Sequence, residues 1–438
     1  MERKAIKQLE DWKRREDRKP LIITGARQVG KTWLMKEFGA ANYKQVAYVN
    51  FESNQQMRSL FEADFSIDRI LLAIEAVTGV KPQAEDTLII FDEIQEAPKG
   101  LTVLKYFCEN APQYHLMAAG SLLGIALHQG TSFPVGKVDF VDMYPMTFRE
   151  FLQALNEEKL LKLLDNKDWQ LISMFKAQLI NLLRQYYYVG GMPEVVLSYI
   201  NTHDLNRVRV LQKAILNAYE QDFSKHAPAS EVPRIRMVWN SIPSQLAKEN
   251  KKFIYGLMKE GARAREFEQA ISWLVDCGLV YKIHRIKKAA MPLKIYEDLS
   301  VFKLYMLDCG LLGALVEAPA ADMLVENSIF SEFKGMFTEQ YVLQQLIVCP
   351  EVSVYYWSSE RSDGELDFVC QLPDKISPIE VKAEENLHAK SLRSFISRYP
   401  DLKGIRFSMS DYREESKMEF TVFLYRILVV AVCVFFVL

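Results

Sequence analysis

Residues 21–38 read LIITGARQVGKTWLMKEF, and this stretch decides the fold of the first part of the chain. The four leading apolar residues predict a short buried strand, and the last residues favour a helix. Between them, GARQVGKT matches the pattern GxxxxGK[ST]. A glycine loop between a strand and a helix presents backbone N–H groups and a helix N-terminus to phosphate. The sequence therefore predicts a phosphate-binding loop at residues 25–32.

The residues of this loop have separate expected roles. Gly25 and Gly30 allow backbone torsions that other residues resist. Lys31 is expected to reach the β- and γ-phosphates, and the Thr32 hydroxyl to bind Mg²⁺. We expect the nucleotide to contact the whole loop, which consists of Gly25, Ala26, Arg27, Gln28, Val29, Gly30, Lys31 and Thr32.

A second motif, LIIFDE, follows at residues 88–93. Asp92 stands at the end of an apolar strand and suits the Mg²⁺ shell, while Glu93 suits polarising the attacking water. Ser121, at the end of the next strand, is expected to sense the γ-phosphate; the alternative is a serine that caps a turn. Glu93, Lys31 and Ser121 are therefore predicted catalytic residues.

Two cations are candidates for stabilising the charge of the transition state. Arg27 lies inside the loop, and Lys137 follows Gly136 in FPVGKVDF. The alternative is that each is an ordinary surface charge. An arginine supplied by another subunit also stays open.

The pattern of elements predicts an α/β fold. Apolar strands at residues 21–24, 46–51, 87–91, 115–119 and 138–141 alternate with helices, which is typical of a doubly wound parallel sheet. Helical patterns dominate from residue 147 to about 199. Further strands are expected after residue 350, so more than one domain follows the first sheet.

Several later segments resemble a known family. GARQVGKT, LIIFDEIQ, GSLLG and YPMTFREFL are similar to bacterial and archaeal AAA-type ATPases with a C-terminal domain of unknown function. YYYVGGMPEVV, FKLYMLDCGLL and GELDFVC…PIEVKA match later segments of that family in order. The resemblance spans about residues 4–412 and implies ATP and Mg²⁺ as cofactors. The chain has Lys137 where the family usually has arginine, and it lacks the arginine's planar fork.

The segment 229–300 has the pattern of a winged helix-turn-helix. Helices are expected from Ile242 and over Ala264–Cys277, followed by a strand ending at Ile286. A basic stretch near that strand can contact DNA or RNA phosphates: His284, Arg285, Lys287, Lys288 and Lys294. The alternative is that the module packs on the ATPase or on another subunit.

The last domain contains a second chemical candidate. Asp367 and the Glu380–Lys382 pair are expected on neighbouring strands, an arrangement that resembles the restriction-endonuclease core. In this resemblance Asp367 and Glu380 would hold Mg²⁺, and Lys382 would orient water. Glu339 matches the acidic residue that the family has on the preceding helix. The alternative is a nuclease-like fold that has surface charges and no turnover.

These patterns predict five parts: an AAA-type P-loop core (1–145), a helical lid (146–228), the winged helix (229–300), a restriction-endonuclease-like domain (301–412) and an atypical hydrophobic tail (413–438). For the tail, a strand, a membrane anchor and a frameshifted end all stay open, although its apolar run after Arg426 is short for a membrane span. Scattered cysteines without a CxxC pair favour a cytoplasmic location.

The predicted function is Mg²⁺-dependent ATP hydrolysis that switches the orientation of the later domains. The alternatives are an ATP-gated, metal-dependent nuclease and a non-catalytic, nucleotide-dependent regulatory module. Besides ATP, the open partners are DNA or RNA, a partner protein and a second copy of the chain. A near-neutral net charge of −2 means that any nucleic-acid contact must come from a local patch.

Overall fold

The computed structural model describes residues 2–63, 65–97, 99–121, 124, 134–248, 252–324, 331–359, 364–383, 390–415 and 417–422. The chain divides into two compact units. Unit 1 comprises residues 1–144 and 273–279, and unit 2 comprises residues 145–272 and 280–438.

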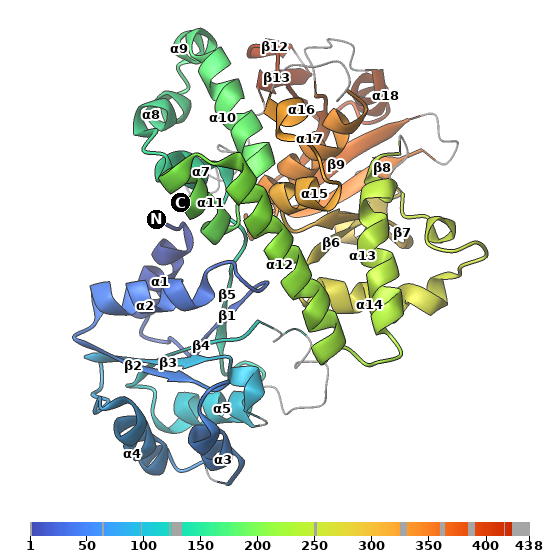
Figure 1. Ribbon diagram of the computed structural model, residues 1–438. Helices are drawn as coiled ribbons and strands as arrows, with labels where there is room; N and C mark the ends of the chain where they lie inside the picture. The colour runs from blue at the N-terminus through green and yellow to red at the C-terminus, as the bar shows by residue number, and fades with distance from the viewer. Residues whose placement is uncertain are drawn as a thin grey trace. The chain divides into compact units, whose positions relative to one another are not determined.

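Unit 1 is a five-stranded parallel sheet of order β2-β3-β4-β1-β5. Helices α1 and α2 lie on one face and α3, α4 and α5 on the other (Figure 1). Its elements are α1 (Ala5–Arg14), β1 (Leu21–Thr24), α2 (Lys31–Asn42), β2 (Gln45–Asn50), α3 (Gln55–Ala63), α4 (Ile67–Thr78), β3 (Thr87–Asp92), the 3₁₀ turn η1 (Ile94–Glu96), α5 (Gly100–Asn110), β4 (His115–Ala119) and β5 (Asp139–Asp142).

The central strands are continuous apolar runs because helices cover both faces of the sheet. Every residue of β3 and β4 is buried. Phe91 packs edge-to-face against Phe51 and Phe61, with ring centroids 5.4 Å apart in both pairs, and the Phe51 and Phe61 rings are tilted against each other at 4.8 Å. The predicted α/β fold with a parallel sheet is confirmed, and α3 is an element that the sequence pattern did not predict.

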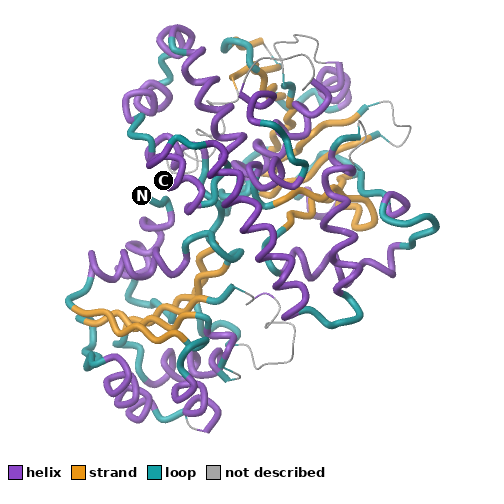
Figure 2. Tube along the Cα trace, in the orientation of Figure 1, coloured by secondary structure: helices purple, strands orange, loops and turns teal. Residues whose placement is uncertain are grey.

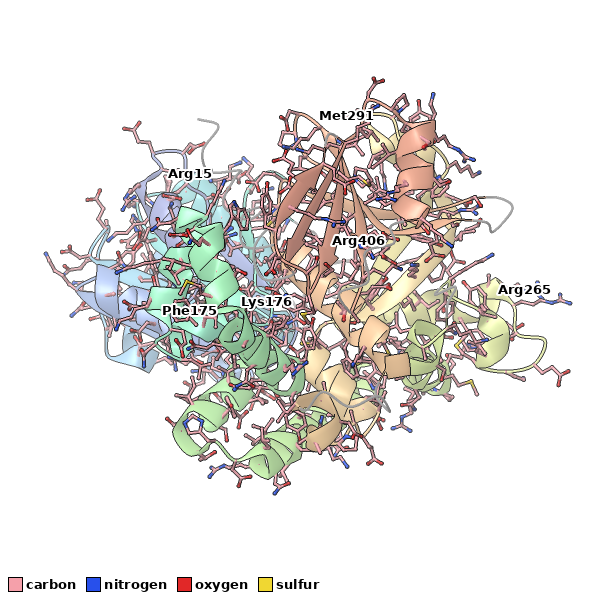
Figure 3. All side chains as sticks on the ribbon, turned by 90° about the horizontal axis from the view of Figure 1, so that it is seen from above. Arg15, Phe175, Lys176, Arg265, Met291 and Arg406 are labelled. Carbon is pink, nitrogen blue, oxygen red and sulfur yellow. The ribbon has the colours of Figure 1, made fainter. Side chains whose placement is uncertain are left out.

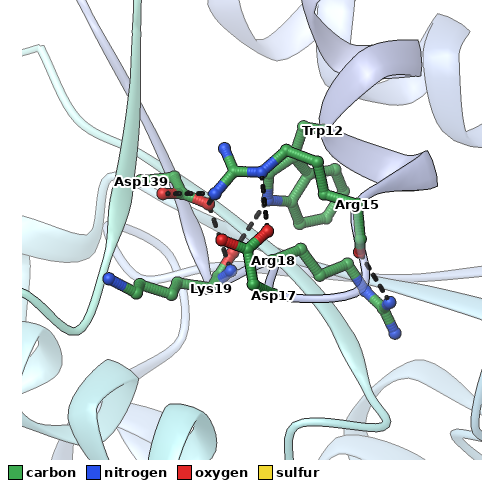
Figure 4. Close-up of polar contacts among 6 residues, drawn as sticks. All are labelled: Trp12, Arg15, Asp17, Arg18, Lys19 and Asp139. Carbon is green, nitrogen blue, oxygen red and sulfur yellow. Dashed lines mark hydrogen bonds and ion pairs between the residues drawn. The ribbon is translucent and has the colours of Figure 1, made fainter.

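The segment between α1 and β1 is fastened to the start of β5 by Asp139 (Figure 4). The Asp139 carboxylate accepts a hydrogen bond from the Lys19 backbone at 3.1 Å and lies 3.4 Å from the Arg15 guanidinium. The Trp12 indole donates to the Lys19 carbonyl at 2.8 Å. These contacts fix where the chain enters β1, and β1 leads directly into the phosphate loop.

Unit 2 combines helices with an eight-stranded mixed sheet of order β12-β13-β11-β10-β9-β8-β6-β7 (Figure 2). Its helices are α7 (Phe148–Ala154), α8 (Glu158–Asn166), α9 (Trp169–Met174), α10 (Lys176–Val189), α11 (Pro193–Thr202), α12 (Leu205–His226), α13 (Val232–Leu246), α15 (Cys309–Leu315), α16 (Ala320–Leu324), α17 (Ser331–Leu346) and α18 (Lys390–Arg398), with the 3₁₀ turns η2 (Tyr255–Leu257) and η3 (Leu293–Tyr296). Helix α14 (Ala264–Asp276) begins in unit 2, and its residues from Trp273 belong to unit 1. Its strands are β6 (Val280–Ile286), β7 (Glu297–Met306), β8 (Ser353–Ser358), β9 (Glu365–Gln371), β10 (Ile376–Val381), β11 (Gly404–Ser408), β12 (Arg413–Glu415) and β13 (Met418–Val422).

The hairpin β6–β7 belongs to the same sheet as the C-terminal strands, because β6 pairs with β8. The predicted border at residues 300/301 therefore falls inside β7. The helix expected to start at Ile242 is instead the end of α13, which begins at Val232. Apolar residues Ile235, Val238 and Trp239 extend its buried face toward the N-terminus. The five-part division and the winged helix stay predictions.

The aromatic residues of the motif YYYVGGMPEV pack in the interior of unit 2 and are not exposed on its surface. Tyr186, Tyr187 and Tyr188 are all buried on α10. The Tyr186 hydroxyl donates to the Met146 carbonyl at 2.5 Å, and the Asp308 carboxylate accepts from the Gly191 backbone at 2.6 Å. The motif thus joins α10 to the start of α15.

Part of the unusual C-terminal segment is a strand. β13 pairs in parallel with β11 along its full length and antiparallel with β12. Residues 423–438, which include the apolar run after Arg426, lie outside the described residues. Among the described residues, no helix has both the length and the apolar character needed to cross a membrane.

Candidate active site

The predicted phosphate loop lies between β1 and α2, as the motif requires. Gly25 has φ +129°, and a Cβ there would lie 2.2 Å from the carbonyl oxygen of Met143. Gly30 caps α2 in the left-handed region with φ +95°. Both glycines are therefore required by backbone geometry, and α2 begins at Lys31 with its N-terminus at the loop.

Lys31 folds back onto the loop. Its ammonium donates to the carbonyls of Gly25 and Ala26, both at 2.8 Å, and its side chain is buried. Burial lowers the pKa of Lys31 to about 8, because desolvation outweighs the opposing attraction of Glu93 and Asp92; the charge of Arg27 lowers it further. The ammonium is thus held by two loop carbonyls, and a bound phosphate oxygen would compete with them for its protons.

Thr32 and Asp92 meet at the carboxyl end of β3. The Thr32 hydroxyl donates to Asp92 Oδ2 at 2.8 Å, although sixty positions separate the two residues. A threonine hydroxyl and a carboxylate are the oxygen ligands that Mg²⁺ accepts. The two residues predicted to hold Mg²⁺ are therefore brought together, and their donor set fits the ion.

Glu93 lies next to this pair in a strained backbone conformation with φ +51°. Its carboxylate accepts from the Ser121 hydroxyl at 2.9 Å, the Ser121 backbone at 3.2 Å and the Gln95 amide at 2.6 Å. Burial raises the pKa of Glu93, but these hydrogen bonds outweigh it and leave the pKa lowered. The carboxylate is thus held ionised, as a general base requires.

Ser121 contacts Glu93 because β4 lies between β3 and β1 in the sheet. The sequence pattern indicated Ser121 but not its partner. Gln95 was not predicted, although its place two residues after Glu93 puts it within reach.

The two candidate cations differ in their surroundings. Arg27 is half-buried in the loop, close enough to Lys31 to affect its titration. The Lys137 ammonium instead pairs with Glu109 at the end of α5, at 3.0 Å. The catalytic role of both residues stays a prediction.

Two further residues support the site and were missed from the sequence. The Tyr48 hydroxyl donates to Asp92 Oδ2 at 2.8 Å, so this oxygen accepts from both Thr32 and Tyr48. Desolvation raises the pKa of Tyr48 to about 12, which keeps it a donor. The buried Arg3 guanidinium donates to the carbonyls of Val29 at 2.9 Å and Tyr144 at 2.6 Å, which anchors the loop.

The basic stretch near β6 is largely neutralised within its own hairpin. Arg285 binds Asp298 at 2.6 Å and Lys294 binds Glu297 at 2.5 Å. His284 lies 3.8 Å from Glu297, and burial lowers its pKa. Lys287 and Lys288 are exposed. The predicted contacts with nucleic-acid phosphates therefore depend mainly on Lys287 and Lys288.

The second chemical candidate lies on β9 and β10. Their antiparallel register pairs Ile379 with Phe368, so one step further Glu380 faces Asp367. The Asp367 carboxylate accepts from the Val381 backbone at 2.7 Å, and Lys382 lies 3.8 Å from Glu380. Among the described residues, no group of three or more His, Cys, Asp or Glu side chains is arranged to hold a metal ion. The metal role of Asp367, Glu380 and Glu339 stays a prediction.

Comparison with known proteins supports the class of the first part of the chain. Residues 17–152 match a family model described as an AAA domain. This part of the chain is thus similar to AAA domains, and its sheet and phosphate loop have the arrangement of a P-loop nucleotide-binding domain. Residues 180–322 and 334–427 match two models described as domains of unknown function.

No curated protein matches the chain. Among solved structures, a Walker-type ATPase of Pyrococcus abyssi is similar over 71% of this chain and 94% of its own, with 13% identity and a TM-score of 0.44. The Aeropyrum pernix Orc1 protein in complex with DNA covers 73% and 93%, with 14% identity and a TM-score of 0.28. The Thermotoga maritima RuvB Holliday junction branch migration motor covers 64% and 90%, with 12% identity and a TM-score of 0.30.

Proposed function

We propose that the chain is a Mg²⁺-dependent ATPase whose hydrolysis cycle switches the conformation of the segments after residue 145. The observation that carries the enzymatic part is the meeting of Thr32, Asp92 and Glu93 at one end of β3, beside the loop that holds Lys31. In the proposed centre, Thr32 and Asp92 act as the metal-binding pair, Glu93 as the base and Lys31 as the phosphate-binding ammonium.

The proposed chemistry assigns one task to each side chain. Lys31 binds the β- and γ-phosphates, and Thr32 with Asp92 holds Mg²⁺, which supplies neutralising charge to the phosphates when bound. Glu93 orients the attacking water and accepts its proton. Ser121 aims Glu93 through its hydroxyl and its backbone N–H.

The proposed switch is supported by hydrogen bonds of Lys31 and Glu93 that must break or be shared when nucleotide and water bind. Lys31 must leave the carbonyls of Gly25 and Ala26 to reach a phosphate, and Glu93 must share its carboxylate between Ser121, Gln95 and water. Ser121 follows the end of β4 by two residues, so a change at Glu93 reaches the backbone next to this central strand. We infer that nucleotide state changes the end of β4 and, through it, the later segments.

Hydrogen exchange of the full chain tests the switch. We expect amides within residues 145–422 to exchange differently with ATP and Mg²⁺ than with ADP and Mg²⁺. Lys31→Ala should abolish the difference, whereas Lys44→Ala, an exposed lysine paired with Asp86, should preserve it. Identical exchange of the wild-type chain in both nucleotide states would refute the switch while leaving hydrolysis intact.

Nucleic acid is a proposed partner with weaker support, because most of the basic stretch is paired. Measuring ATP hydrolysis with and without plasmid, single-stranded DNA and RNA tests it. A stimulation that Lys287→Ala together with Lys288→Ala removes would support contact at this hairpin. An unchanged rate with all three nucleic acids would exclude them as activators.

A further inference from the structure

A buried lysine lies at the centre of the acidic residues of unit 2. Lys303, on β7, has no exposed surface, and its ammonium forms an ion pair with Glu365 on β9. The same ammonium lies 4.7 Å from the centroid of the Tyr356 ring on β8. A lysine is almost never this deeply buried unless it is paired, so its surroundings must compensate the charge.

The compensation comes from three carboxylates rather than one. Burial alone lowers the pKa of a lysine, but attraction by Glu365, Glu339 and Asp367 outweighs burial, and the pKa of Lys303 is raised. These residues come from α17 and β9, which are distant from β7 in sequence. The ammonium thus pairs directly with Glu365 and is attracted by Glu339 and Asp367, so residues of α17 and β9 both contribute to its surroundings.

The carboxylates of this cluster also have other protein partners. The buried Tyr305 hydroxyl donates to Glu339 Oε2 at 3.2 Å. Asp367 Oδ2 accepts from the Val381 backbone at 2.7 Å. These neutral donors fix the positions of the Glu339 and Asp367 carboxylates without removing their charge, so the positive charge beside them comes from Lys303.

Glu380 faces its own cations. It is 2% exposed, and it lies 3.9 Å from the buried Arg406 of β11 and 3.8 Å from Lys382. Figure 3 shows Arg406 among the strands of this sheet. Each of the acidic residues predicted to bind metal in this unit is thus close to a positively charged side chain of the protein.

We propose that the Lys303 ammonium fills the central charge position of the Glu339, Glu365 and Asp367 cluster, so that the cluster takes no divalent cation in the wild-type chain. The centre that resembles a nuclease site is a core in which a lysine ammonium occupies the place of a cation. Replacing Lys303 by an uncharged side chain leaves three carboxylates around one position and opens it to a divalent cation.

Mn²⁺ binding to the full chain without nucleotide tests this proposal by electron paramagnetic resonance. We expect Lys303→Met to bind about one more Mn²⁺ per chain than wild type, since carboxylate number governs affinity for such ions. Lys375→Met, an exposed lysine in the turn between β9 and β10, is the matched control and should bind as wild type. A folded Lys303→Met chain that binds no additional Mn²⁺ would overturn the proposal.

Two further measurements keep the test decisive if Lys303→Met does not fold. The double variant Lys303→Met with Glu365→Gln removes both members of the ion pair, and Mn²⁺ should raise its melting temperature more than that of wild type. In the wild-type chain, plasmid and single-stranded DNA with Mn²⁺ should stay intact. A wild-type Mn²⁺ site or a cleavage activity that Asp367→Asn removes would contradict a lysine-filled cluster.

Discussion

The two acidic centres of the molecule treat their carboxylates in opposite ways. Asp92 in unit 1 accepts hydrogen bonds from the neutral hydroxyls of Thr32 and Tyr48. The cluster of unit 2 is held by the charged ammonium of Lys303. A hydroxyl positions a carboxylate without offsetting its charge, whereas a lysine ammonium offsets one unit of the cluster's negative charge. Whether an acidic centre can bind Mg²⁺ therefore depends on which groups its carboxylates contact and not only on the number of carboxylates.

The largest expected effect is at Glu93. Glu93→Gln keeps the shape of the side chain but removes the base, and general-base catalysis contributes about 10²–10⁴-fold. We expect the rate of ATP hydrolysis to fall by about that factor while ATP affinity stays near wild type. Steady-state kinetics and equilibrium binding measure the two quantities. A mutant with near wild-type turnover would assign the base elsewhere.

The next effect is the loss of stability at Lys303. Removing one partner of a buried ion pair costs about 3–5 kcal/mol, because the remaining charge is left uncompensated. We expect Lys303→Met to speed amide exchange in β7 and β9 accordingly. Lys375→Met should cost within about 0.5 kcal/mol, as exposed substitutions do. If both variants exchanged alike, the cluster would not depend on Lys303.

ATP affinity should depend on pH through Lys31. The pKa of Lys31 is lowered to about 8, so the free loop loses its ammonium charge above that pH. Phosphate binds the charged form, so affinity should be constant below pH 8 and fall about tenfold per unit above it. For folding, the unfolded chain keeps this proton up to its ordinary pKa of 10.5, so the Lys31 contribution to stability rises from pH 8 to 10.5.

Equilibrium titration with ATP from pH 6.5 to 9.5 measures this dependence. Lys31→Arg supplies a cation that does not titrate in this range, so the affinity that it retains should not fall with pH. If the wild-type affinity for ATP did not change up to pH 9.5, Lys31 would not lose its proton near pH 8 as its burial implies.

The smallest effect is expected at Tyr48. Tyr48→Phe removes one of the two donors to Asp92 Oδ2, and one hydrogen bond is worth about 1 kcal/mol. We expect kcat/KM to fall about fivefold and the Mg²⁺ concentration for half-maximal activity to rise. A merely structural role would lower stability and leave the Mg²⁺ dependence unchanged.

Much of unit 1 could be predicted because its information is local. The strand, loop and helix around Gly25–Thr32 are contiguous, and LIIFDE shows both a buried strand and its functional end. Tyr48 and Arg3 could not be predicted in this way. Their partners, Asp92 and Val29, are distant in sequence, and only the order of the strands and the path of the N-terminus bring them together.

The centre of unit 2 shows the same limit more sharply. Asp367 and Glu380 were correctly expected on neighbouring strands, because β9 and β10 are joined by a short turn. Lys303 was missed, since its role depends on contacts of β7 with α17 and β9. A lysine inside the apolar run VFKLYML nevertheless indicates a buried ion pair, because a charged side chain in a buried strand needs a partner of opposite charge.

ATP hydrolysis by the purified full chain tests the central claim most directly. Wild type and Lys44→Ala should hydrolyse ATP at similar rates in the presence of Mg²⁺, and Lys31→Ala should reduce hydrolysis to background. Hydrolysis by Lys31→Ala at the wild-type rate would contradict the assignment of residues 25–32 as the catalytic phosphate loop.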